Sequence, residues 1–183
     1  MPIYVALLRG INVGPTKRVK MDDLRKSFEG LGLEQVKTYN QSGNVVFKAG
    51  KVSPSALGTK IEERIVGDFG FSVSVIVRTS AEWTQSIESN PFLKQRGVDP
   101  DKLHVTFLAD VPGASALKKL ADFTVAPDQS CCIGRQIYLY LPNGFSKSSL
   151  WKVPWEKALA VITTTRNWRT VNAIHQMCRD CEE

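Results

Sequence analysis

The sequence predicts an α+β fold in which two ferredoxin-like subdomains follow each other as a duplication. In the first half, runs with strand alternation and runs with the spacing of an amphipathic helix appear in the order β-α-β-β-α-β. The second half repeats this order as β-α-β-β-α, with a less distinct last strand and an added C-terminal helix. Element order is repeated, whereas residue identities are not. Each half is therefore expected to form a four-stranded antiparallel sheet with its helices on one face.

Glycine, proline and capping residues delimit the elements of the first half. Its strands and helices are expected at residues 3–9, 21–31, 36–39, 45–47, 53–69 and 73–77. The helix from Met21 has apolar residues three and four positions apart, which gives it one apolar face. Ser53-Pro54 offers an N-cap followed by a proline at the first helical position, and Gly70 is expected to end that second helix.

A connecting segment separates the two halves. Thr79-Ser80-Ala81-Glu82 has the T-x-x-E form of a capping box and predicts a helix that ends at Asn90-Pro91. A charged loop with a glycine and a proline follows and is the candidate boundary. The predicted domains are residues 1–78, the first ferredoxin-like subdomain; residues 79–101, a connecting helix and loop; and residues 102–183, the second ferredoxin-like subdomain with the C-terminal helix.

The second half is expected to contain a strand, a helix, a hairpin and two further helices. These elements are placed at residues 103–107, 117–123, 130–141, 154–159 and from 171 onward. Gly134-Arg135 is the expected hairpin turn. Val161-Ile162 is the candidate for a short last strand, and Thr163–Trp168 is placed where the terminal helix begins.

The composition is that of a globular protein with excess positive charge. Among the 183 residues, 43% are apolar and 23% are charged, and the net charge is +6. Such an excess favours anionic partners, although solubility alone also explains it. No apolar run reaches the roughly 18 residues of a membrane span, and the apolar N-terminus is expected to be a first strand and not a signal peptide. A cytoplasmic protein without membrane association is therefore expected.

The cysteines and histidines give weak support for metal or acid–base chemistry. Cys131 and Cys132 are adjacent, and Cys178-x-x-Cys181 lacks the second pair of a zinc site. Reduced structural thiols are the simpler interpretation. His104 alternates with apolar strand residues and is expected to face solvent or a polar layer. No metal and no cofactor are predicted.

The loop after the first strand is the first candidate binding motif. Leu8–Gly14 contains two glycines together with Arg9 and Asn12, and several lysines and arginines follow. A glycine-rich loop between a strand and a helix can bind phosphate with its backbone N–H groups. The spacing matches neither a P-loop nor G-x-G-x-x-G. A simple turn followed by a solvated basic helix face is the alternative.

Three further polar motifs are candidate binding or catalytic sites. In the segment Thr163–Trp168, Arg166 and Asn167 lie where the terminal helix is expected to start and can bind an anion there, while Trp168 stacks on a base or packs in the core. Gln41, Ser42 and Asn44 either present polar groups to a ligand or satisfy the backbone of a hairpin turn. Ser146-Lys147 is a weak nucleophile–base candidate.

These motifs together resemble the domain-of-unknown-function 1697 family. The resemblance rests on Leu8–Gly14, Thr38–Phe47, Asn90-Pro91-Phe92 and Thr165–Val171 in that order. It implies two ferredoxin-like subdomains and no established activity. Its motif residues fall on Arg9, Asn12, Gln41, Ser42, Asn44, Arg166, Asn167 and Trp168, with Ser146-Lys147 as a weaker match. Pro15 and Arg169 depart from the usual family motifs.

Three functions remain open from the sequence. The first is binding of an anionic ligand, either a nucleotide or nucleic acid, through the Arg and Asn motifs. The second is a small-molecule enzyme with a site between the two subdomains, lined by Arg9, Asn12, Arg166 and Asn167. The third is a purely structural role for these residues. The sequence leaves catalytic residues and oligomeric state open, with a monomer favoured.

Overall fold

The computed structural model describes residues 1–182 and contains two compact units. Unit 1 comprises Met1–Gln85 together with the chain from Asn172 onward, and unit 2 comprises Ser86–Val171. Both boundaries fall inside helices, in α3 (Ser80–Glu88) and in α6 (Trp168–Glu182). The chain thus passes twice from one unit to the other without leaving helical structure.

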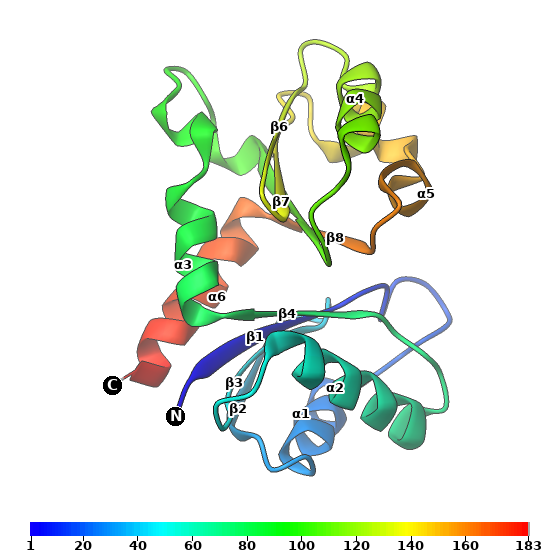
Figure 1. Ribbon diagram of the computed structural model, residues 1–183, viewed down its shortest axis with the longest axis vertical. Coiled ribbons are helices and arrows are strands. Elements are labelled where there is room, and N and C mark those ends of the chain that lie inside the picture. The colour runs from blue at the N-terminus through cyan, green and yellow to red at the C-terminus, as the bar shows by residue number, and fades with distance from the viewer. Residues whose placement is uncertain (183) are drawn as a thin grey trace. The chain divides into compact units, whose positions relative to one another are not determined.

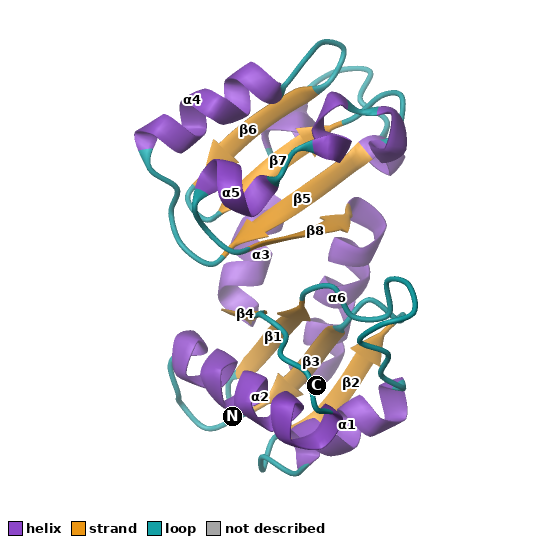
Figure 2. Ribbon diagram, turned by 90° about the vertical axis from the view of Figure 1, so that its right-hand side faces the viewer, coloured by secondary structure: helices purple, strands orange, loops and turns teal. Residues whose placement is uncertain are grey.

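Unit 1 has the ferredoxin-like topology that the sequence predicts. Its elements up to α3 are β1 (Ile3–Leu8), α1 (Met21–Glu29), β2 (Glu34–Tyr39), β3 (Asn44–Lys48), α2 (Pro54–Phe69) and β4 (Val75–Thr79). The antiparallel strands are ordered β2-β3-β1-β4. Figures 1 and 2 show α1 and α2 on one face of this sheet, with the part of α6 that belongs to unit 1 on the other.

Local signals in the sequence explain the ends of the unit 1 helices. The Ser53 side chain accepts a hydrogen bond from the Ala56 N–H and caps α2, which ends at Gly70 in the left-handed region, at φ 76°. At the start of α3, the Thr79 hydroxyl accepts from the Glu82 N–H while the Glu82 carboxylate accepts from the Thr79 N–H. This reciprocal pair is the capping box that the T-x-x-E spacing predicts.

The core of unit 1 lies between the sheet and helices α1 and α2. Alternate residues of β1 pack there against apolar residues of both helices, and Phe28 contacts Phe47 edge to face at 5.5 Å between ring centroids. The remaining residues of β1, Ile3, Val5 and Leu7, point to the opposite sheet face and are also buried. Because both faces are covered, β1 is apolar along its whole length.

Unit 2 repeats the topology with a shorter second helix, which has 5 residues where its counterpart α2 has 16. Its regular elements are β5 (Leu103–Leu108), α4 (Ala114–Phe123), β6 (Gln129–Ile133), β7 (Gln136–Tyr140), α5 (Trp155–Leu159) and β8 (Thr163–Asn167). The strand order β6-β7-β5-β8 is the counterpart of that in unit 1. Short 3-10 turns at Pro91–Lys94, Pro100–Lys102, Phe145–Lys147 and Ser149–Lys152 complete the unit. The predicted duplication of two antiparallel sheets with an added C-terminal helix is confirmed.

The duplication extends to the register of strand pairing. Val5 of β1 lies opposite Arg78 of β4, and Val105 of β5 lies opposite Arg166 of β8. Each arginine is the fourth residue of its strand and directly precedes the residue that caps the next helix. The repeat thus includes an arginine at the same position of both strands, which the order of elements alone did not reveal.

Two local predictions are wrong. The last strand of unit 2 is Thr163–Asn167 and not Val161-Ile162, because these polar residues complete the ladder with β5 although they lack apolar alternation. The His104 ring does not face open solvent. It is partly buried, with its centroid 5.3 Å from that of Phe145, and this burial lowers its pKa.

Candidate functional site

The loop between β1 and α1 begins at a fixed point on the sheet. The Leu8 N–H donates to the Gly43 carbonyl at 2.8 Å, and the Arg9 N–H donates to the Ser74 carbonyl at 2.9 Å. These bonds hold the end of β1 against the turn between β2 and β3 and against the chain before β4. The Arg9 side chain, which follows immediately, is exposed.

Asn12 holds the rest of this loop in shape. Its side-chain Nδ2 donates to the carbonyls of Val19 and Gln41, each at 2.9 Å, and its Oδ1 accepts from the Val19 N–H at 2.9 Å. The backbone of Asn12 has φ 55°, a conformation that asparagine tolerates better than most residues. One amide therefore closes the loop and joins it to the neighbouring turn.

The turn between β2 and β3 is organised by two asparagines. Asn44 is fully buried, and its Nδ2 donates to the Tyr39 carbonyl at 3.1 Å and to the Asn40 Oδ1 at 2.9 Å. The same Asn40 oxygen accepts from the Ser42 N–H at 2.9 Å. Gln41 and Ser42 lie exposed at the tip. Asn44 thus supports the turn, while Gln41 and Ser42 are exposed to solvent at its tip.

Gly43 allows the turn and the loop to pack against each other. It has φ 77°, and a Cβ added there would lie 2.7 Å from the Leu8 Cβ and 3.0 Å from the Ile11 Cδ1. Only glycine fits both the backbone conformation and the space. This contact, together with the Asn12 amide, makes the loop and the turn one surface.

The basic loop, defined as residues 9–20, presents positive charge on this surface. It contains four basic residues and no acidic residue. All four, Arg9, Lys17, Arg18 and Lys20, have exposed side chains. Val13 is 76% exposed in the same loop. The loop therefore carries four exposed cations and is joined to the neighbouring turn by hydrogen bonds of Asn12.

Arg166 in unit 2 is in a different environment. Its side chain is only 8% exposed, and its Nη1 donates to the Thr164 hydroxyl at 2.6 Å and to the Thr165 carbonyl at 2.9 Å. Burial lowers its pKa to about 10, so the guanidinium remains charged at neutral pH. These bonds give Arg166 a clear structural role within its own strand.

The residues after Arg166 start α6. The Asn167 Oδ1 accepts from the Thr170 N–H at 2.8 Å and so caps the helix. Trp168 is buried, with 8% of its surface exposed. The eight predicted residues therefore fall into two groups. Arg9, Asn12, Gln41, Ser42 and Asn44 come together in unit 1, and Arg166, Asn167 and Trp168 are consecutive in unit 2.

Sequence reasoning missed the counterpart of Arg166 in unit 1. Arg78 is 2% exposed, and its Nη1 donates to the Val77 carbonyl at 3.0 Å, just as Arg166 donates to the carbonyl of the residue before it. The available signal was an arginine immediately before the capping residue of a helix in both halves. This repetition supports a structural role at both positions.

The described residues give no metal centre and no membrane-spanning helix. Within residues 1–182, no group of three or more His, Cys, Asp or Glu side chains is arranged to hold a metal ion. Cys178 is buried, and burial raises the pKa of its thiol to about 12. None of the helices in this part of the chain has both the length and the apolar character needed to cross a bilayer.

Comparison with known proteins identifies the family. A family model described as "Protein of unknown function (DUF1697)" matches residues 1–138, which is more than half of the chain. The chain belongs to this family. The match includes the basic loop and the turn at Gln41–Asn44, and it ends before Arg166. The DUF1697 resemblance that the motifs predicted is thereby confirmed.

A solved structure extends the similarity over the full chain. The conserved bacterial protein SP0830 from Streptococcus pneumoniae is 25% identical, with a TM-score of 0.77 over 97% of this chain and 98% of that chain. No match was found among curated proteins. The fold of this chain is therefore seen in a second protein, and the family description names no activity.

The packing of Gly43 gives a stability prediction. Gly43→Ala is expected to destabilise the protein by about 2–4 kcal/mol, since it combines a positive φ with a clash against Leu8. Gly32→Ala is the matched control, because Gly32 has φ 75° with no atom within 4 Å of the added Cβ. Urea denaturation should show the smaller loss for Gly32→Ala, about 1 kcal/mol. Equal losses would show that the contact with Leu8 and Ile11 contributes nothing.

The buried position of Arg166 gives a second prediction. Arg166→Ala removes two internal hydrogen bonds and leaves a cavity, so the melting temperature should fall by several degrees. Arg169→Ala changes an exposed arginine three residues later and should alter stability by no more than about 0.5 kcal/mol. A thermal melt of Arg166→Ala that coincides with the wild type would contradict the structural role.

Proposed function

We propose that this protein binds nucleic acid, and that the basic loop of unit 1 contacts the phosphate backbone. The observation that supports this most strongly is the group of four exposed cations in a 12-residue segment without acidic residues. A polyanion that contacts several cations releases its condensed counterions, and this release drives binding. The overall charge of +6 acts in the same direction.

The rigid support of the loop favours this function over simple solubility. The Asn12 amide and the Gly43 contact hold the loop before any partner arrives. Binding then requires little additional ordering of the backbone, which lowers its entropic cost. Lysines needed only for solubility require no such support. Gln41 and Ser42, exposed at the adjoining turn, supply polar groups for the sugar or phosphate.

The form of the surface favours an extended polyanion as the ligand. Small-molecule sites are concave and bury most of their ligand, whereas Arg9, Lys17 and Arg18 are exposed on a loop. The rings of Tyr4, Phe47 and Tyr138 in the sheets are buried and cannot stack on bases. Tyr4 and Phe47 stack on each other in the core, and the Tyr138 hydroxyl donates to the Ser86 carbonyl. Binding through phosphates should therefore depend weakly on base sequence.

A charge-reversal experiment tests the proposal. Fluorescence anisotropy with a labelled 12-mer of oligo(dT) should show binding at low salt that weakens steeply as salt is added. Lys17→Glu with Arg18→Glu should weaken binding by about tenfold or more. It should also reduce the slope of log K against log salt by about 1.4, since each lost contact with single-stranded nucleic acid accounts for about 0.7.

The control variant makes the same change in net charge at a different place in the chain. Lys118 and Lys119 are exposed on α4 in unit 2, and their double substitution by Glu alters the net charge by the same amount. This variant should bind the oligonucleotide more tightly than the loop variant. Equal losses in both variants would indicate a response to net charge alone. Absence of wild-type binding at low salt would refute nucleic-acid binding altogether.

A further inference from the structure

Unit 2 contains a cavity that the proposed nucleic-acid contact does not use. Its volume is about 480 Å³, within the range of roughly 300–1,000 Å³ typical of small-molecule sites. One side is formed by residues 125–128, between α4 and β6, and the other by residues 143, 146–149, 151 and 152, between β7 and α5. The Ser146-Lys147 motif lies on this second side.

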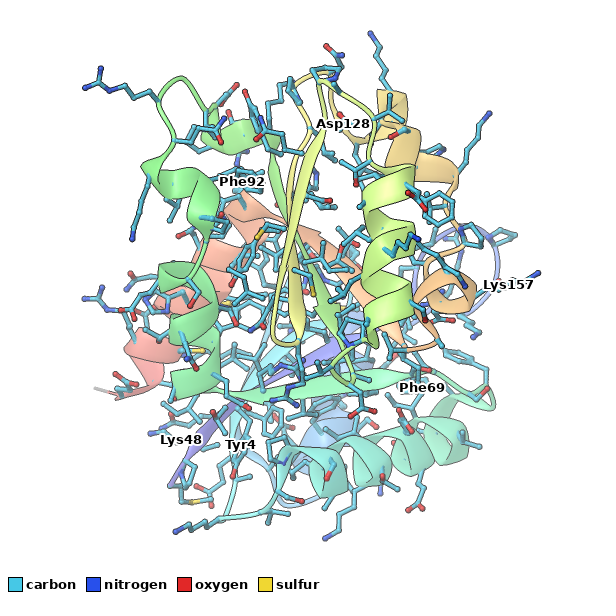
Figure 3. The ribbon with its side chains drawn as sticks, turned by 45° about the horizontal axis from the view of Figure 1, so that its top comes forward. Tyr4, Lys48, Phe69, Phe92, Asp128 and Lys157 are labelled. Carbon is cyan, nitrogen blue, oxygen red and sulfur yellow. The ribbon has the colours of Figure 1, made fainter. Side chains whose placement is uncertain are left out.

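Hydrogen bonds hold the two sides of the cavity together. The Asp128 Oδ2 accepts from the Ser148 hydroxyl at 2.7 Å and from the Ser149 N–H at 3.2 Å. The Ser149 hydroxyl donates to the Phe123 carbonyl at 2.9 Å and accepts from the Val125 N–H at 3.3 Å. Asp128, only 8% exposed, is thus built into the site, and Figure 3 labels it beside the start of β6. The cavity is preformed.

An exposed aromatic ring lines this cavity. Trp151 is 55% exposed, and its ring meets that of Phe145 edge to face with centroids 5.2 Å apart. Val125, on the opposite side of the cavity, is 58% exposed. Trp151 and Val125 thus give this cavity an apolar part that a ligand can contact. A planar ring is the ligand group that best matches an accessible indole.

The polar lining indicates that the same ligand is anionic. Lys147 and Lys152 line the cavity with exposed side chains, together with Ser146 and Asn143. Asp128 is the one acidic residue among the described lining residues. Its Oδ2 is engaged by the serines, and its Oδ1 can accept a hydrogen bond from a ligand N–H. Two cations and one largely occupied carboxylate give the site a positive balance.

We propose that this cavity binds a nucleoside monophosphate. The base stacks on Trp151, the phosphate lies with Lys147 and Lys152, and Asp128 accepts from an N–H group of the base. The site consists of residues of unit 2 and the basic loop belongs to unit 1, so the two proposals can be tested independently. Binding here is non-covalent and requires no further reactant.

Calorimetric titration of the full chain with AMP tests this site. AMP should bind at least about tenfold more tightly than either adenosine or inorganic phosphate, because only AMP joins both recognised groups. Trp151→Ala should weaken AMP binding by about tenfold, in line with the loss of one stacked base, while Trp151→Phe should retain most of it. Inorganic phosphate binding as tightly as AMP would overturn the proposal.

Lysine variants separate specific from general charge effects. Lys152→Gln should weaken AMP severalfold and leave adenosine unchanged. Lys157→Gln is the control, since Lys157 is exposed on α5, extends away from the helix and is not a lining residue (Figure 3). Equal losses in Lys152→Gln and Lys157→Gln, with unchanged melting curves, would refute the site. The loop variant with Lys17→Glu and Arg18→Glu should bind AMP as the wild type does, which distinguishes failure of this site from failure of the proposed nucleic-acid contact.

Discussion

The burial of both faces of β1 is the constraint on which unit 1 depends. Every residue of Ile3–Leu8 is at most 6% exposed, and the strand is paired on both edges, with β3 and with β4. Such a strand must be apolar throughout, so it cannot itself present a polar side chain to a partner. Polar side chains that could contact a partner must therefore lie beyond the end of this strand. Arg9 is the first residue beyond that point and the first exposed cation of the basic loop.

The candidate surface follows from how the chain leaves this strand. The bond from Leu8 to Gly43 brings the turn between β2 and β3 alongside the loop, and the Asn12 amide then joins the two. The Asn12 side chain bonds backbone groups, and the Asn44 amide bonds the Tyr39 carbonyl and Asn40, so both support the loop and the turn. The cations of the loop are exposed on this surface, as are Gln41 and Ser42 of the turn.

Local signals predicted most of the fold, whereas long-range pairing decided the rest. Ser53 and the Thr79–Glu82 capping box act within four residues, and both are confirmed. The strand Thr163–Asn167 was missed because its polar residues show no apolar alternation, and only the ladder with β5 defines it. The cavity in unit 2 was likewise not foreseeable, since hydrogen bonds between residues some twenty positions apart bring Asp128 to Ser148. For the candidate site, the residue types were visible in the sequence, but their division into supporting and exposed groups required coordinates.

The basic loop is the surface proposed to contact nucleic acid. Backbone amide NMR spectra of the ¹⁵N-labelled protein, recorded during titration with the oligo(dT) 12-mer, test it most directly. If the loop binds the oligonucleotide, the largest chemical-shift changes should cluster at residues 9–20 and 40–43. Changes confined to other parts of the chain, with these residues unaffected at saturation, would contradict it.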